Sequence, residues 1–223
     1  MTETAPVLTI DGPSGSGKGT LSRAVARELG WHFLDSGAIY RALAILVLRT
    51  GTSYDNEEQI AALGREMDLS FTADDPPRIL LDGENIADEV GKETTGNAAS
   101  RIAQMPSVRR ALLDKQLSFR RAPGLVADGR DMGTVVFKDA DRKVFLTASA
   151  KVRAERRLKQ LKDKGLDVNL DSLTREIEER DKRDRERAEA PLVMAKDALL
   201  IDSSDLGVAE VIHRVLDWVR EKS

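Results

Sequence analysis

A glycine-rich segment near the N-terminus, Ile10–Thr20 (IDGPSGSGKGT), restricts the fold of this chain more than any other stretch. It matches the pattern G-x-x-x-x-G-K and lies between an apolar run, Val7–Ile10, and a helical pattern, Gly17–Leu29. The glycines let backbone N–H groups turn inward around phosphate oxygens, and the start of the helix adds a partial positive charge. We therefore expect Lys18 to supply a point charge for the β- and γ-phosphates of ATP.

The loop departs from the generic motif at one position that bears on metal binding. Gly19 stands where a serine or threonine hydroxyl commonly contacts Mg²⁺, and Thr20 follows it. We expect Mg²⁺ to be held mainly by ATP and by water, with Asp128 as an indirect carboxylate ligand. The predicted ATP contacts are Gly12, Pro13, Ser14, Gly15, Ser16, Gly17, Lys18, Gly19, Thr20, Arg156 and Arg157, of which the last two would close over the nucleotide.

Short apolar runs at five places predict the strands of a sheet. They are Val7–Ile10, Trp31–Leu34, Leu125–Ala127, Lys143–Leu146 and Ala198–Ile201, and four of them run into an aspartate, at Asp11, Asp35, Asp128 and Asp202. Helical patterns lie between the runs, and Val208–Val219 has the i, i+3, i+4 apolar spacing of one buried helix face. The alternation predicts an α/β fold, a five-stranded parallel sheet flanked by helices, with ligands at the carboxyl ends of the strands.

Two segments do not fit this alternation of strands and helices. Leu69–Ala87 carries short alternating runs around Asp82-Gly83, a strong hairpin signal, and predicts a small antiparallel insert between helical stretches near Glu57–Met67 and Gly91–Ala103. Ser172–Glu189 is helical by propensity but almost wholly charged, with an apolar stripe too thin to bury a face in the core. It is either a solvated helix with i, i+4 ion pairs or a mobile lid whose arginines close on an anion.

Composition removes several classes of function. The chain of 223 residues has no cysteine and only two histidines, which leaves no disulfide, no cysteine-ligated zinc and little basis for a histidine-dependent triad. Its longest apolar run, Ala42–Leu48, is far shorter than a membrane span, and Met1–Pro6 has no signal-peptide pattern. We expect a cytoplasmic monomer that makes no contact with membranes or nucleic acid.

Four motifs give a specific resemblance. TIDGPSGSGKGT, LDSGAIYR, ADGRDMGTVVF and ERDKRDRERAEAPL all resemble the bacterial cytidylate kinases, a family of nucleoside monophosphate kinases, and the resemblance runs from end to end of the chain. It implies in-line transfer of the γ-phosphate of ATP to CMP, and also to dCMP, giving CDP or dCDP and ADP, with Mg²⁺, in pyrimidine nucleotide metabolism. It also implies one kinase domain, 1–223, with a core (1–35, 104–149 and 190–223), an acceptor-nucleotide-binding insert (36–103) and a helical lid (150–189).

Arginines dominate the predicted acceptor side. Guanidinium forks match phosphate oxygens in pairs, and Arg180, Asp184 and Arg187 have the i, i+4, i+7 spacing of one helix face. The family implies that Asp131 and Ser100 accept from the cytosine amine, that Arg109 donates to the ring acceptors, and that Arg41 and Arg130 hold the phosphate. The expected CMP contacts are Ser36, Tyr40, Arg41, Ser100, Arg109, Arg130, Asp131, Arg180, Asp184 and Arg187.

Catalysis would need no general base, because a phosphate monoester is mostly dianionic near neutral pH. We expect Lys18, Arg130, Arg180 and Arg187 to position the reactants and cancel charge in a loose transition state.

Three other functions remain to be weighed. A P-loop kinase for a hydroxyl acceptor such as shikimate would use Asp35 or Asp128 as a base, but a dianionic phosphate explains the arginines better. A nucleotide-dependent switch would want a guanine-reading N-K-x-D pattern. A nucleic-acid-binding face over Lys151–Arg187 is disfavoured by interleaved acids and missing aromatics.

Overall fold

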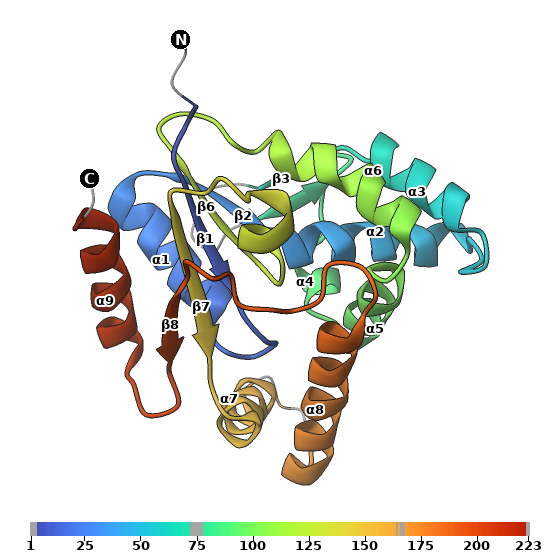
Figure 1. The fold of residues 1–223 in the computed structure, drawn as a ribbon. Helices are drawn as coiled ribbons and strands as arrows, with labels where there is room; N and C mark the ends of the chain where they lie inside the picture. Colours follow the sequence, from blue (N-terminus) through green and yellow to red (C-terminus); the bar gives the residue numbers. More distant parts are fainter. Residues whose placement is uncertain (1–3, 72–77, 164, 166–167, 222–223) are drawn as a thin grey trace. The chain divides into compact units, whose positions relative to one another are not determined.

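The computed structural model describes residues 4–71, 78–163, 165 and 168–221 of the chain (Figure 1). Residues cluster into two compact units. The first unit joins the two ends of the chain, Met1–His32 and Ala122–Ser223, and the second is the continuous segment Phe33–Arg121. The domain boundaries expected from the sequence remain predictions, and the two units are described separately below.

Five strands form one parallel sheet in the order β2-β6-β1-β7-β8, as the alternating sequence pattern predicts. The strands are β1 (Val7–Asp11), β2 (His32–Asp35), β6 (Leu125–Gly129), β7 (Arg142–Thr147) and β8 (Leu199–Asp202). Strand β1 is central and fully buried, which explains why its sequence is an unbroken apolar run rather than an alternating one. Its last residue, Asp11, pairs in register with Gly129, the last residue of β6, so these two strands end level beside the glycine-rich loop, while β7 continues past Phe145 to Thr147.

Helices of the first unit surround this sheet. They are α1 (Lys18–Leu29), α7 (Ala150–Lys162), α8 (Leu170–Glu186) and α9 (Val208–Arg220), with a π-helical turn, η1 (Met132–Val136). Helix α9 packs against α1 through its predicted apolar face, which buries Val211, Val215 and Val219. Figure 1 shows α7 and α8 beyond the carboxyl ends of β7 and β8, where parallel sheets bind their ligands.

The second unit contains the predicted antiparallel insert. Its helices are α2 (Ser36–Thr50), α3 (Glu57–Glu66), α4 (Ala87–Val90), α5 (Glu93–Ile102) and α6 (Pro106–Leu117), and its small sheet has the order β3 (Leu69–Phe71), β4 (Ile79–Leu81) and β5 (Glu84–Asn85). Asp82 and Gly83 both have positive φ, 50° and 82°, as the tight turn between β4 and β5 requires. The Asp-Asp-Pro-Pro stretch within the predicted insert lies outside the described residues.

One boundary in this unit is wrong in the sequence prediction. The run of extended residues was expected to reach Ala87 and the next helix to begin at Gly91, but β5 ends at Asn85 and α4 begins at Ala87. The Asn85 side chain accepts a hydrogen bond from the Ala87 N–H at 3.2 Å, which turns the backbone into a short helix. Gly91 ends that helix instead of starting the next one.

The expectation that the charged segment buries no face is also wrong. Helix α8 buries Leu173 together with two acids, Asp181 and Asp184. Arginines pair with both carboxylates, so the buried face consists of ion pairs rather than apolar contacts. Within the described ranges, no helix combines the length and the apolar character needed to cross a bilayer.

Candidate active site

The glycine-rich loop of the first unit follows directly from β1 and leads into α1. A Cβ atom at Gly12 would lie 1.9 Å from the Leu146 carbonyl oxygen on β7, so only glycine lets the loop leave the sheet along this path. Gly17 is the residue directly before α1. Its φ of 95° is a left-handed conformation, which glycine adopts readily. The loop therefore has the strand–loop–helix geometry that binds phosphate through backbone N–H groups.

Lys18 is the first residue of α1 and is only 6% exposed. Its ammonium donates a hydrogen bond to the Pro13 carbonyl oxygen at 2.8 Å, which folds the side chain back across the loop. The buried charge is thereby held against the backbone of the loop. Phosphate oxygens entering the loop would find a cation already in place, with a carbonyl that they can replace as acceptor.

Two arginines of α7 brace the loop from outside. Arg153 donates to the Ser14 carbonyl at 2.9 Å, while Arg156 donates to the Ser16 carbonyl at 3.4 Å and to the Ser203 carbonyl at 2.6 Å. Arg153 also forms a two-pronged ion pair with Asp181 on α8, with donor–acceptor distances of 3.1 and 2.5 Å. The loop, α7 and α8 are thus joined through one buried guanidinium.

Asp11, at the end of β1, ties the loop to the residues that follow β6. Its two carboxylate oxygens accept the Met132 and Gly133 backbone N–H groups at 2.9 and 2.8 Å. Burial raises the pKa of Asp11 to about 6, although the two N–H groups partly oppose this effect by stabilising the carboxylate. This aspartate fixes the backbone that comes directly after Arg130 and Asp131.

Arginine and aspartate side chains form a second cluster in the first unit. Arg130 donates to Asp184 at 2.8 Å, and Arg187 lies 3.6 Å from an oxygen of Asp131. Burial acts to raise the pKa of Asp184, but Arg130, Arg180 and Arg187 outweigh it and hold that pKa below its ordinary value. The structure therefore brings together Arg130, Asp131, Asp184 and Arg187, four of the residues that the motifs predict.

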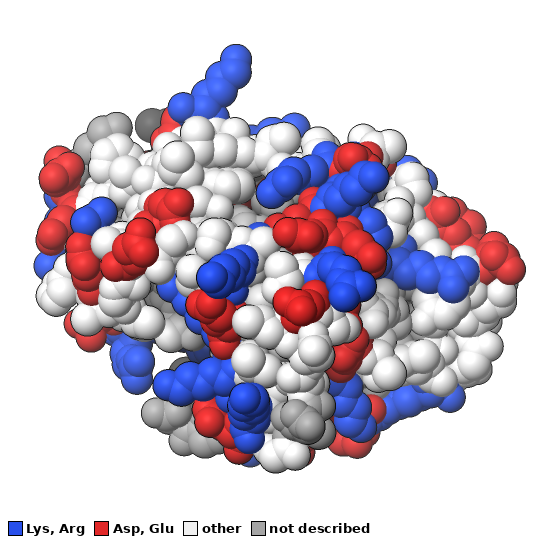
Figure 2. Space-filling model, turned by 90° about the horizontal axis from the view of Figure 1, so that it is seen from below, with Lys and Arg blue, Asp and Glu red and all other residues white. Residues whose placement is uncertain are grey.

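The predicted common helix face holds for only part of this cluster. Arg180 and Asp184 lie on α8 one turn apart, but the helix ends at Glu186 and Arg187 is the extended residue after it. Its Nε donates to the Ala190 carbonyl, where the backbone reverses toward β8. Figure 2, which views α7 and α8 from below, shows acidic and basic side chains intermingled on this face.

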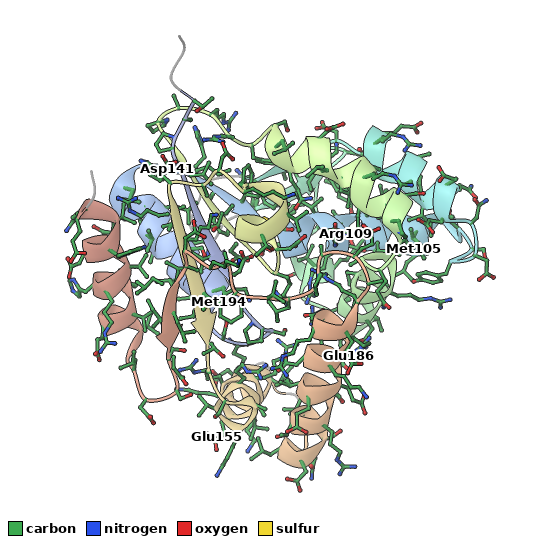
Figure 3. The ribbon with its side chains drawn as sticks, in the orientation of Figure 1. Met105, Arg109, Asp141, Glu155, Glu186 and Met194 are labelled. Carbon is green, nitrogen blue, oxygen red and sulfur yellow. The ribbon has the colours of Figure 1, made fainter. Side chains whose placement is uncertain are left out.

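The second unit holds the remaining predicted acceptor residues. Ser36 and Tyr40 lie one turn apart at the start of α2, and both are buried. Arg41 donates to the Val90 carbonyl, and its guanidinium lies over Gly96 of α5, where a Cβ would come within 3.1 Å. Arg109 extends from α6 (Figure 3), and its guanidinium carbon is 5.9 Å from the centre of the Tyr40 ring. Ser100 is a half-buried residue of α5.

Other predicted residues lie where their segments place them. Thr20 is exposed on α1, Arg157 is half-buried on α7, and Asp128 is buried near the end of β6. A Cβ at position 19, where the generic loop has its hydroxyl residue, would lie 3.5 Å from an Asp128 oxygen. No cluster of three or more His, Cys, Asp or Glu side chains suited to a metal occurs among the residues that the structure describes.

Sequence reasoning missed three polar residues that the fold makes prominent. Neither Arg153 nor Asp181 is among the predicted site residues, yet the two, 28 positions apart, pair in the interior. Gln116, which accepts the Ser36 hydroxyl at 2.8 Å, carries no motif. A signal existed only for Arg153, which precedes Arg156 by three residues and so shares its helix face.

Comparison with known proteins agrees with this geometry. The family description "Cytidylate kinase" matches residues 8–221. The chain is 63% identical to a cytidylate kinase from Methylococcus capsulatus, with 99% of both chains aligned, and 52% identical to one from Klebsiella pneumoniae, with 100% and 98% aligned. A cytidylate kinase from Serratia proteamaculans is 53% identical over 99% of this chain and 97% of its own. On this full-length similarity and the motifs that carry it, the chain belongs to the cytidylate kinase family.

Proposed function

We propose that this protein transfers the γ-phosphoryl group of ATP to CMP, giving CDP and ADP, and that it also accepts dCMP. The observation that carries the proposal is the pairing, within one unit, of a phosphate loop containing Lys18 with a cluster of arginines and aspartates. Asp11 connects the two, because it ends the strand before the loop and holds the backbone after Arg130 and Asp131. A donor phosphate and an acceptor phosphate would each have cations beside them.

The donor half follows from the loop. Backbone N–H groups between Gly12 and Thr20 and the N-terminus of α1 would bind the β- and γ-phosphates of ATP, and Lys18 would exchange its Pro13 contact for a phosphate oxygen. Arg153 and Arg156 hold the loop by its Ser14 and Ser16 carbonyl groups. Arg157, on the same helix, would close over the nucleotide.

Binding of the acceptor nucleotide would depend on guanidinium groups whose positions carboxylates already fix. Asp184 is ionised at neutral pH and accepts a hydrogen bond from Arg130 Nε, which orients the guanidinium that would bind the CMP phosphate. Arg41, Arg180 and Arg187 would share its charge, while Ser36, Tyr40, Ser100, Arg109 and Asp131 would contact the nucleoside. Because Asp131 accepts hydrogen bonds, it favours the cytosine amine over the carbonyl oxygen of uracil.

The reaction itself would depend on position and charge. The CMP phosphate is mostly dianionic at neutral pH, with a second pKa of about 6, so its oxygen attacks the γ-phosphorus without losing a proton to the protein. The bond from the γ-phosphorus to the bridging oxygen of ADP breaks as the new bond forms in line. Lys18 and the arginines at positions 130, 180 and 187 would neutralise the oxygens between which charge moves.

The residues present fit a magnesium ion that arrives with ATP. Asp128 offers a buried carboxylate opposite position 19, and a hard cation that keeps several waters can be held by such a group indirectly. The chemistry supplied by bound Mg²⁺ is charge neutralisation at the β- and γ-phosphate oxygens. Three further points stay predictions of the same proposal: the protein is a monomer, it is located in the cytoplasm, and the helical segment 150–189 acts as a lid.

A panel of acceptors tests the assignment. Release of ADP should be measured by a coupled assay with ATP, Mg²⁺ and, in turn, CMP, dCMP, UMP, AMP and shikimate. We expect CMP to give the highest kcat/KM, with dCMP next. Higher turnover with shikimate, or none with any pyrimidine monophosphate, would contradict the proposal.

A further inference from the structure

The hydrogen bond between Ser36 and Gln116 fixes the direction in which the Ser36 hydroxyl can bind anything else. The two residues are 80 positions apart, only 4% and 2% exposed, and joined at 2.8 Å within the second unit. A hydroxyl group has one proton to donate and two lone pairs that accept. Which partner donates therefore decides what Ser36 can offer a nucleotide.

The surroundings of Gln116 settle that direction. Its Nε2 donates to the Leu112 carbonyl at 3.3 Å, and a carbonyl oxygen can only accept. The amide group is therefore oriented with its oxygen toward Ser36. Since that oxygen carries no proton, the Ser36 hydroxyl must donate to it, and its only hydrogen is used inside the protein.

Ser36 is thus left as an acceptor, which excludes some groups of a bound nucleotide and favours others. Phosphate oxygens at neutral pH and the carbonyl oxygens of uracil only accept, so they gain nothing from it. Ribose hydroxyls can rotate to suit either polarity, so they are not selected by it. The N3–H of uracil is also a donor, so the two bases are separated by the exocyclic group beside it. Cytosine carries an amine there, a donor of fixed polarity, and uracil carries a carbonyl oxygen, so a permanent acceptor facing that group distinguishes CMP from UMP.

A second contact places Ser36 on the same surface as Arg109, the arginine that is predicted to bind the base. Ser36 and Tyr40 share one face of α2, and Arg109, Leu112 and Gln116 share one face of α6. Ser36 contacts Gln116, and the Tyr40 ring lies 5.9 Å from the Arg109 guanidinium carbon, so the two faces are matched over two turns. The hydroxyl of fixed polarity and the arginine belong to one surface of the unit.

We infer that Gln116 is a specificity-determining residue: by taking the Ser36 proton it makes Ser36 a permanent acceptor for the exocyclic amine of cytosine and an opponent of uracil. Gln116 acts through Ser36 and does not touch the nucleotide itself. The inference rests on the proposed function and adds to it a residue that no motif contains.

Gln116→Met tests this inference, because methionine keeps the length and helix propensity of glutamine but offers Ser36 no strong acceptor. Ser36 could then rotate and donate to a uracil oxygen. The ratio of kcat/KM for CMP to that for UMP should fall roughly tenfold, the effect of one buried group changing from unpaired to paired. The ratio for CMP to dCMP should not change, since the ribose does not depend on this polarity.

Companion variants separate this effect from a general disturbance. Ser36→Ala should also lower the CMP-to-UMP ratio, and adding Gln116→Met to it should lower the ratio no further. Gln59→Met, the same change at an exposed glutamine of α3, should leave both ratios at the wild-type value. Melting temperature and the KM for ATP, measured for each variant, report on folding and on the donor site.

The outcomes are distinct for the two claims. If wild-type protein turns over CMP but Gln116→Met keeps the wild-type CMP-to-UMP ratio, or changes only the CMP-to-dCMP ratio, the inference about Gln116 is wrong and the proposed function stands. A further drop in the ratio when Gln116→Met is added to Ser36→Ala would also overturn it. If wild-type protein phosphorylates neither nucleotide, the proposed function itself fails.

Discussion

Replacing Asp181 with alanine tests the buried ion pair that joins α8 to the phosphate loop. Arg153 and Asp181 have side chains only 3% and 4% exposed, and two hydrogen bonds connect them. After the change the Arg153 guanidinium would stay buried, and the acceptors left to it in the described part of the chain are the Ala148 and Ser14 carbonyls. Leaving one charge of a buried pair without its partner costs about 3–5 kcal/mol.

That loss should be visible as lower thermal stability. For a protein of this size, each kcal/mol shifts the melting temperature by about 2–4 °C, so Asp181→Ala should melt roughly 6–20 °C below the wild type. Urea unfolding followed by circular dichroism gives the free energy of unfolding directly. A loss below about 1 kcal/mol would refute the reasoning, since it would mean that water reaches the pair and weakens it.

An exposed pair on the same unit provides the control. Glu210 and Arg214 are one turn apart on α9 at 2.7 Å, with about half of each side chain exposed. Glu210→Ala should change the free energy of unfolding by no more than about 0.5 kcal/mol, because solvent screens such a pair. Measuring the free energy of unfolding of both variants compares the loss of a buried ion pair with the loss of an exposed one.

A double replacement separates stability from support of the loop. Arg153→Met with Asp181→Leu removes both charges and fills their space with apolar groups, which should recover much of the lost stability. The Ser14 carbonyl would still lack its Arg153 donor. We therefore expect near-normal unfolding but a KM for ATP several-fold above wild type; an unchanged KM would show that the loop does not need this brace.

Further predictions concern the remaining site residues. Lys18→Ala should lower kcat by several orders of magnitude with an unchanged circular dichroism spectrum, and near-normal turnover would remove Lys18 from the mechanism. Asp184→Ala should weaken CMP binding at least about tenfold and ATP binding much less in isothermal titration, because Arg130 loses its hydrogen bond to Asp184; the reverse order would contradict the assignment. Burial raises the pKa of Asp11 from 3.8 to about 6, so its contribution to stability is complete below pH 3.8 and lost as the pH rises through about 6. The free energy of unfolding of the wild type relative to Asp11→Asn should therefore fall by roughly 3 kcal/mol between pH 4 and 7, at about 1.4 kcal/mol per pKa unit, and a difference independent of pH would be inconsistent with a buried titrating carboxyl.

Local patterns were enough to predict much of this fold. Val7–Asp11 is a buried central strand and reads as an apolar run, and the tight turn at Asp82 and Gly83 has its own sequence signature. The apolar spacing of Val208–Arg220 likewise predicts a helix with one buried face. Each of these features depends on residues that are close together in the sequence, so the sequence alone reveals them.

Pairings between distant charged or polar residues could not be predicted in the same way. Nothing near Asp181 distinguishes it from the exposed acids around it, since its burial depends on Arg153, 28 positions away. The role of Gln116 likewise depends on its hydrogen bond with Ser36, which is 80 positions away in the sequence. The boundary at Ala87 failed for a smaller reason, a single side-chain hydrogen bond from Asn85 that outweighs the extended pattern.

Transfer of a labelled phosphoryl group tests the central claim most directly. Wild-type protein and Lys18→Met should be incubated with γ-³²P-labelled ATP, Mg²⁺ and CMP, and the nucleotides separated by anion-exchange chromatography. We expect the label to appear in CDP, in equal amount to the ADP formed, with wild-type protein and to be almost absent from CDP with Lys18→Met. Label released as inorganic phosphate, or retained in ATP, with the wild-type protein would contradict the account.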